Sequence, residues 1–158
     1  MKLKIKIRRL KETKIPKIID KGDWVDLYIP KYERFELKKG DLELIDLGFA
    51  VKLPNGFEAI MACRSSTPSK AGVIFANSIG IIDNSYSGNN DSWKIQAYAI
   101  KDTTIYPESR IAQFRIQLSQ KATIWQKLKW LFCNGIEIEE VEYLDSKDRG
   151  GIGSTGVF

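Results

Sequence analysis

A carboxylate and a phenol that could do chemistry together stand close in residues 80–88, whose sequence is Gly-Ile-Ile-Asp-Asn-Ser-Tyr-Ser-Gly. The apolar start predicts a strand, Asn-Ser favours a turn, and glycine tolerates backbone angles that other residues avoid, so we predict a tight β-hairpin. Asp83 and Tyr86 would project from its tip into one cavity, with Asp83 placed to act as a general base. The alternative is that Asp83 only caps the turn.

Donors suited to phosphoryl oxygens occur in the polar stretch Arg64-Ser65-Ser66 and in the tail, residues 148–158. A guanidinium offers two parallel donors and hydroxyls add short ones, so the first stretch could hold a phosphate. A loop or the capped start of a helix is the simpler explanation. The tail is rich in glycine and carries Arg149, and we expect it to stay mobile until an anion orders it.

Two more candidates come from the alternation of apolar and polar residues in predicted strands. Asp26 lies in residues 24–30 and points away from their apolar face, so it is available to a site. Gln113 lies among apolar neighbours in residues 110–116, and its amide needs partners if it is buried.

Composition restricts the possible chemistry. The chain has 158 residues, of which 43% are hydrophobic and 28% charged, which fits one globular domain. Histidine is absent, which excludes Ser-His and Cys-His catalysis within one chain, and two cysteines, expected to be reduced, cannot fill a closed zinc shell. A net charge of +5 suits an anionic partner, either nucleic acid or a small phosphate compound.

The rest of the chain is predicted to be mostly strand. Residues 2–9 alternate, and their basic side would keep an edge strand soluble. Residues 41–53 and 57–63 are predicted to pair as a hairpin through Pro54-Asn55-Gly56. Further strands are predicted at residues 93–100 and 136–144. No apolar run is long enough to cross a bilayer and no signal peptide is evident, so we expect a cytoplasmic protein without a membrane partner.

One helix interrupts this pattern at residues 123–133. Its apolar side chains have helical spacing and are expected to dock on the body of the protein, although a partner or a membrane is an alternative. They are Ile124, Trp125, Leu128, Leu131 and Phe132.

In this order the segments resemble the five motifs of the trimeric dUTP pyrophosphatases, the dUTPases, most closely those of Bacillus-type bacteria and their phages. The resemblance covers nearly the whole chain. Its motifs are Asp26 within Val-Asp-Leu-Tyr, Arg64-Ser65-Ser66, residues 77–88, Arg110-Ile111-Ala112-Gln113, and residues 149–156.

The resemblance implies an all-β, dUTPase-like jelly-roll or β-barrel, with a short inserted helix at residues 123–135. Residues 1–147 would form the β domain, and residues 148–158 a flexible tail that closes the active site. The subunits would form a homotrimer with active sites shared between chains, each completed by a neighbour's tail.

The resemblance also implies hydrolysis of dUTP to dUMP and pyrophosphate with Mg²⁺. Asp83 would activate the water that attacks the α-phosphorus, Tyr86 would pack under the deoxyribose, and Asn77 would read the uracil edge. Asp26 would reach the metal through water. The remaining residues that the resemblance assigns to the phosphates or the water are Arg64, Ser65, Ser66, Arg110, Gln113, Arg149, Gly153, Ser154 and Thr155. Among them, Ser66 would stabilise charge on the oxygen that bridges the α and β phosphorus.

The chain departs from the family pattern in the tail, where Ile152 takes the place of the usual Phe over uracil. We hypothesise that Trp93, just after residues 80–88, supplies an aromatic lid instead. The segment at residues 123–135 has no role in the family pattern, and a protein partner there is possible.

Other functions stay open at this stage. The dCTP deaminases share the fold and the Arg-Ser-Ser motif but use a Glu in the hairpin region. A basic β-barrel with exposed aromatic residues could bind single-stranded nucleic acid, although we expect no nucleic-acid partner here. A protein-binding role through the extra helix is the third alternative.

Overall fold

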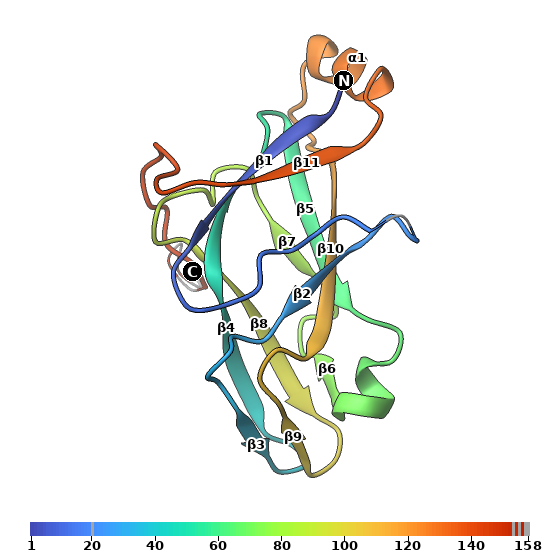
Figure 1. The fold of residues 1–158 in the computed structure, drawn as a ribbon, viewed down its shortest axis with the longest axis vertical. Coiled ribbons are helices and arrows are strands. Elements are labelled where there is room, and N and C mark those ends of the chain that lie inside the picture. Colours follow the sequence, from blue (N-terminus) through green and yellow to red (C-terminus); the bar gives the residue numbers. More distant parts are fainter. Residues whose placement is uncertain (20, 153, 155, 157–158) are drawn as a thin grey trace.

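Two β-sheets enclose the core of the computed structural model, which describes residues 1–19, 21–152, 154 and 156 (Figure 1). The first sheet has five strands in the order β11-β1-β4-β8-β6. Their bounds are β1 Leu3–Arg9, β4 Leu42–Lys52, β6 Val73–Phe75, β8 Ser92–Ala99 and β11 Ile136–Glu140. Neighbours in this sheet run antiparallel except β1 and β11, which are parallel.

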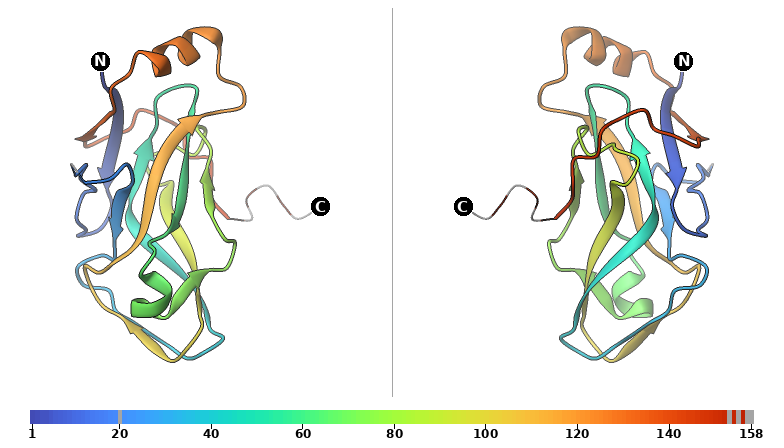
Figure 2. Two further views of the ribbon diagram at one scale, coloured as in Figure 1. Left: turned by 90° about the vertical axis from the view of Figure 1, so that its right-hand side faces the viewer. Right: turned by 90° about the vertical axis from the view of Figure 1, so that its left-hand side faces the viewer.

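The second sheet has four antiparallel strands in the order β2-β10-β5-β7. Their bounds are β2 Val25–Tyr28, β5 Phe57–Cys63, β7 Gly80–Ile82 and β10 Arg110–Leu118. A separate ribbon pairs β3, Phe35–Leu37, with β9, Thr103–Ile105. Figure 2 shows the two sheets edge-on as layers, with the ribbon at one end and the helix α1 at the other.

The core forms because alternate residues of each strand face the opposite sheet. Leu3, Ile5 and Ile7 of β1 are fully buried, whereas the basic residues between them lie toward solvent. Trp93 of β8 lies at the centre and packs edge-on against Phe114 of β10, with ring centroids 5.1 Å apart. The all-β prediction is confirmed, but the described strands form open sheets and not a closed barrel.

The predicted strands exist, whereas their predicted pairings are wrong. β4 and β5 are joined by the turn at Pro54 but belong to different sheets, so they do not form a hairpin. Residues 80–88 do not form the predicted hairpin either. Their strand β7 pairs with β5, whereas the next strand, β8, pairs with β4 and β6. β1 is not an edge strand either, because β11 pairs alongside it and sets acidic residues against its basic ones.

The predicted helix is present as α1, Ile124–Leu131, and starts at a capping box between Thr123 and Gln126. It contacts the body through Trp130, whose ring lies 5.3 Å from that of Phe57. The apolar side that we expected to dock is instead exposed, with Trp125 at 76% and Leu131 at 73%. The prediction of which side docks is therefore wrong.

Candidate active site

Three charged residues from separate strands meet at one end of the second sheet, and we call them the arginine cluster: Asp26, Arg64 and Arg110. Asp26 binds Arg64 through one carboxylate oxygen at 2.8 Å and Arg110 through the other at 3.1 Å. The Asp26 side chain is only 14% exposed, whereas Arg110 is half exposed. The cluster therefore holds two guanidinium groups side by side, an arrangement suited to phosphoryl oxygens.

Strand pairing explains why these distant residues meet. β10 lies between β2 and β5, so that Gln113 faces Asp26 on one side while Ala112 faces Cys63 on the other. Arg64 directly follows β5. The amide of Gln113 donates to the carbonyl of Cys63 at 3.2 Å, which supplies a partner that its burial requires.

Thr67 fixes the loop that carries Arg64, a role that the sequence did not indicate. Its buried hydroxyl accepts from the Arg64 amide at 3.1 Å and donates to the Ile111 carbonyl at 2.7 Å. Thr67 begins a single π-helical turn, Thr67–Ala71, which Ser66 immediately precedes. Ser65 is exposed and Ser66 is half-buried. Both residues directly follow Arg64 of the arginine cluster in the sequence.

A second group of predicted residues forms a cavity of about 250 Å³, which we call the tail pocket. Asp83 and Tyr86 line one side of it, and the start of the tail lines the other. Lys94 and Ser92 also line it, and neither was a candidate from sequence. The lining residues from the tail are Arg149, Gly150, Gly151, Ile152 and Ser154.

Asp83 caps its own turn, as the simpler interpretation of the sequence suggested. Its carboxylate accepts from the amide of Ser85 at 2.8 Å and from the hydroxyl of Ser85 at 2.5 Å. These bonds to Ser85 lower the pKa of Asp83 below its ordinary value. The side chain is nevertheless exposed to the pocket, so it is an ionised carboxylate held in one orientation and open to a ligand.

Tyr86 is half-buried and donates from its hydroxyl to the Ser92 carbonyl at 2.8 Å. Burial, with the nearby carboxylates of Asp91 and Asp46, raises the pKa of Tyr86, so the phenol stays neutral. Gly151 of the tail passes so close that an added Cβ would lie 3.0 Å from the Tyr86 hydroxyl. A glycine here therefore lets the tail lie against the ring.

The tail pocket and the arginine cluster lie far apart in a single chain. Ile82, just before Asp83, pairs with Ala59 near the start of β5, whereas Arg64 follows the end of β5. At about 3.3 Å per residue, the distance along β5 from Glu58 to Arg64 is roughly 20 Å. One chain therefore does not bring the two groups onto the same phosphate.

Comparison with known proteins assigns the chain to a family. A family model described as dUTPase matches residues 24–156. The chain belongs to the dUTPase family. It is 42% identical over 156 residues to the SPbeta prophage-derived deoxyuridine 5'-triphosphate nucleotidohydrolase of Bacillus subtilis strain 168, with 99% of each chain covered.

Solved structures of other dUTPases share the fold. The crystal structure of a dUTPase from Streptococcus mutans matches with a TM-score of 0.63 at 23% identity, covering 74% of this chain and 98% of that one. A mutant dUTPase from phage phi11 of S. aureus, whose structure reveals the coordination of a structural Mg(II) ion, matches with a TM-score of 0.63 at 18% identity, covering 76% and 94%. The resemblance drawn from the motifs is thus confirmed at the level of family and fold.

Two residues that were predicted to contact the base lie elsewhere. Trp93 is fully buried between Phe49 and Phe114, so it cannot cover a bound base and the aromatic-lid hypothesis is wrong. Asn77 is exposed in the turn before β7 and does not line the tail pocket. Gly153 and Thr155 lie outside the described residues. Ile152 lines the pocket, where the family pattern has its Phe.

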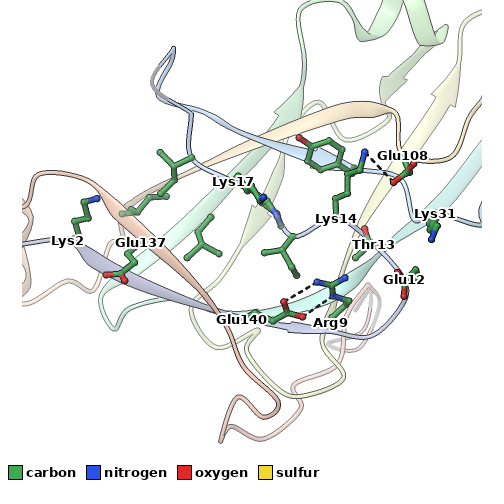
Figure 3. A pocket seen from close by; sticks show the side chains of 16 residues that line it. Lys2, Arg9, Glu12, Thr13, Lys14, Lys17, Lys31, Glu108, Glu137 and Glu140 are labelled. Atoms are coloured by element: carbon green, nitrogen blue, oxygen red, sulfur yellow. Dashed lines mark hydrogen bonds and ion pairs between the residues drawn. The ribbon is translucent and has the colours of Figure 1, made fainter.

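A second hollow of this dUTPase, about 940 Å³ in volume, has none of the predicted site residues among the described residues that line it. It lies between β1, β11 and residues 12–18, and Figure 3 shows that charged side chains line it. Several of them pair with one another, including Arg9 with Glu140 at 2.9 Å and Lys14 with Glu108 at 3.3 Å. Size alone therefore does not mark the active site.

Among the described residues, no cluster of three acidic, cysteine or histidine side chains could hold a metal ion. In the same part of the chain, no helix is both long and apolar enough to span a membrane.

Proposed function

We propose that this chain hydrolyses dUTP to dUMP and pyrophosphate, as the names of its relatives indicate for them. The observation that carries the proposal is the 42% identity over nearly the full length of both chains. The geometry agrees with it, because the ionised carboxylate of Asp83 faces a small pocket. In addition, Asp26 binds two arginines at one end of the same sheet.

In this proposal Asp83 takes a proton from the water that attacks the α-phosphorus, which a general base typically accelerates by ~10²–10⁴. Its fixed orientation by Ser85 supports the role because a base must point at the water before reaction. Tyr86 supplies a flat apolar wall for the sugar, and its hydroxyl is already occupied by the Ser92 carbonyl. In this placement the ring would leave no room for a 2′-hydroxyl. Asn77 remains proposed for the uracil edge.

The arginine cluster would bind phosphoryl oxygens, with Ser65, Ser66 and Gln113 beside it and Arg149 closing from the tail.

The structural Mg(II) of the phage phi11 enzyme supports a metal in this family. Both oxygens of Asp26 are paired with arginines, which fits contact with Mg²⁺ through water better than direct coordination. Bound Mg²⁺ would neutralise charge on the triphosphate.

We further propose a homotrimer in which the arginine cluster of one chain meets the tail pocket of another. The separation of the two groups along β5 supports sharing, since one chain cannot apply both to one nucleotide. Leu42, Tyr98 and Ile74 lie in register on β4, β8 and β6 and leave an exposed apolar strip that a second copy would cover.

The deciding experiment measures pyrophosphate release from dUTP, dCTP, UTP and dTTP, with and without Mg²⁺. We expect release from dUTP alone, and stronger release with Mg²⁺. Ammonia release from dCTP would instead identify a deaminase, although none of the described residues that line the tail pocket is a glutamate. Binding of oligonucleotides that weakens with salt, without hydrolysis of dUTP, would favour the nucleic-acid alternative.

The exposed side of α1 favours a protein partner as a second function. Ile124, Trp125, Leu131 and Phe132 are each more than half exposed, and the lysines of this segment favour an acidic partner. The test compares the wild type with Trp125→Lys/Leu131→Lys, using photo-cross-linking from α1 and peptide mapping of the products. Cross-links lost in the variant at unchanged dUTP turnover support this function, and identical products from both proteins contradict it.

A further inference from the structure

The turn that carries Asp83 extends beyond the paired part of its strand. β7 ends at Ile82, which pairs with Ala59 of β5, so the sheet holds the chain only up to the residue before Asp83. The bonds from Ser85 to the Asp83 carboxylate lie within the turn itself. They fix the carboxylate relative to its turn, and the direction of the turn must be set by other contacts.

The side chain of Asn84 makes such a contact. Its half-buried amide group donates to the carbonyl of Pro54 at 2.8 Å and to the carbonyl of Phe57 at 2.9 Å. Both acceptors belong to residues 54–57, which join β4 to β5 and which we call the receiving turn. A bond from the Phe57 amide to the Pro54 carbonyl at 3.1 Å closes this turn. The two donors of one amide group therefore bridge two backbone positions and fix the Asp83 turn against them.

Asp83 thus lies between two fixed side chains. Tyr86 holds the far side of the turn through its hydroxyl, which donates to the Ser92 carbonyl at 2.8 Å. Tyr86 also lines the tail pocket, whereas Asn84 is not among the described residues that line it. Asn84 would therefore act on the reaction through Asp83 and not through contact with the nucleotide.

The receiving turn is itself packed against α1. Phe57 is fully buried, and its ring lies 5.3 Å from that of Trp130. Gly56 has a φ of +84° and lies so close to α1 that an added Cβ would overlap the side chain of Gln126. The helix therefore supports the carbonyls that accept from Asn84.

We infer that Asn84 is a positioning residue that aims the Asp83 carboxylate, and that α1 supports it through the receiving turn. A base must point at the attacking water before reaction, and a displacement of about 1 Å can cost on the order of 10²-fold in rate. Loosening this contact should accordingly lower kcat and leave nucleotide affinity nearly unchanged. The inference rests on the proposed function, because it takes Asp83 to be the base.

Asn84→Ala removes both donors. We expect kcat for dUTP to fall roughly tenfold, while the affinity for a non-hydrolysable dUTP analogue, measured by calorimetry, changes less than about twofold. The matched control is Asn55→Ala, which removes an exposed amide from the receiving turn and should keep kcat. Unchanged kcat in Asn84→Ala would overturn the inference. A loss of affinity as large as the loss of kcat would also overturn it, since Asn84 would then belong to the binding site.

Asn84→Asp separates the donors from the bulk of the side chain. The carboxylate has the size of the amide but, when ionised, offers no proton to the two carbonyls. At pH 8 we therefore expect kcat to fall at least as far as in Asn84→Ala. Wild-type kcat in this variant would show that the two donors do not position Asp83.

A double-mutant cycle tests the support from α1. Trp130→Ala, or Trp130→Leu should the alanine variant not fold, should lower kcat severalfold by loosening the receiving turn. Because both changes act through that turn, the Trp130 change should lower kcat less when Asn84→Ala is already present. The control is Trp125→Ala, which removes an exposed ring of the same helix. Independent effects of the two changes would contradict the role of α1.

Hydrogen exchange tests the contact without any substrate. The backbone amides of Ser85 and Tyr86 are bonded within the turn, to the carboxylate and the carbonyl of Asp83 at 2.8 Å and 3.0 Å. Both should exchange faster in Asn84→Ala than in the wild type or in Asn55→Ala. Unchanged exchange would contradict the inference. Faster exchange in a protein whose wild type does not hydrolyse dUTP would contradict only the proposed function.

Discussion

The carboxylate of Asp26 holds the guanidinium of Arg64 at 2.8 Å across the end of the second sheet. Because its other oxygen holds Arg110, this one side chain sets the spacing of both cations before any phosphate arrives. An enzyme gains from such preorganisation, since the cations need not be gathered during the reaction.

Asp26→Ala should therefore release both arginines and lower kcat/KM for dUTP by on the order of 10²-fold. Steady-state kinetics at several Mg²⁺ concentrations would measure the loss. The matched control is Glu36→Ala, which removes a carboxylate paired with Arg34 on the exposed ribbon and should leave turnover unchanged. Equal kinetics for wild type and Asp26→Ala would show that the cluster does not contact the substrate.

Asp83→Asn should reduce kcat by ~10²–10⁴ while the affinity for a non-hydrolysable dUTP analogue changes little, because the amide keeps the shape but cannot take a proton. Single-turnover kinetics and calorimetric titration separate the two quantities. Near-normal turnover in this variant would remove Asp83 from the mechanism.

The pH profile offers a separate test of the Asp83–Ser85 contact. Since the pKa of Asp83 is lowered, the carboxylate stays ionised, and the acid limb of kcat/KM should lie below the ordinary Asp value of about 3.9. Ser85→Ala removes the hydroxyl donor, so the acid limb should move upward. The same pKa shift stabilises the fold above the unfolded-state pKa, and that contribution is lost as pH falls through the folded-state pKa. Ser87→Ala, in the same loop, serves as the control, and an unmoved limb in Ser85→Ala would refute the assignment.

Trp93→Ala should destabilise the fold by about 3–5 kcal/mol, because the ring fills the centre of the core between Phe49 and Phe114. Chemical denaturation would measure the change. Trp125→Ala, which removes an exposed ring of α1, should shift stability by no more than about 0.5 kcal/mol. If Trp93→Ala left stability intact and weakened dUTP binding, its buried position would be in error.

Removal of residues 148–158 should lower kcat by on the order of 10²-fold and leave the melting temperature nearly unchanged, since the removed residues bury little apolar surface. Kinetics and thermal unfolding of the same preparation would compare the two. A large fall in melting temperature would mean that the tail is part of the core.

The strands could be predicted from the sequence because alternating residues such as Leu3, Ile5 and Ile7 face the same side of a strand, whichever strand pairs with it. Their pairing could not be predicted, because a turn such as Pro54-Asn55-Gly56 favours reversal of the chain but does not determine which sheet receives the next strand. Here β4 and β5 enter different sheets. Trp93 was assigned to the substrate for the same reason. Which side of β8 faces the core depends on where the opposite sheet lies, and the sequence does not give that position.

The site was predicted in part. Asp26 and Arg64 were candidates from the residues themselves and Arg110 came from motif resemblance, whereas their meeting required the long-range pairing of β2, β10 and β5. The contacts of Thr67 with the Arg64 amide and the Ile111 carbonyl escaped prediction, because contacts with the backbone leave no pattern in the residue types. The exposure of α1 was also missed, since helical spacing gives an apolar side but not what covers it.

The parallel pairing of β1 with β11 joins the two ends of the polypeptide, as in the hydrogen bond between Met1 and Asn134, which lie 133 positions apart. During synthesis β1 therefore waits for more than a hundred further residues before its outer neighbour β11 is made. Until then one side of it is unpaired, and closing so long a loop is slow. The first sheet should accordingly be completed only after β11 has been synthesised, and the lysines of β1 would limit aggregation in the interval.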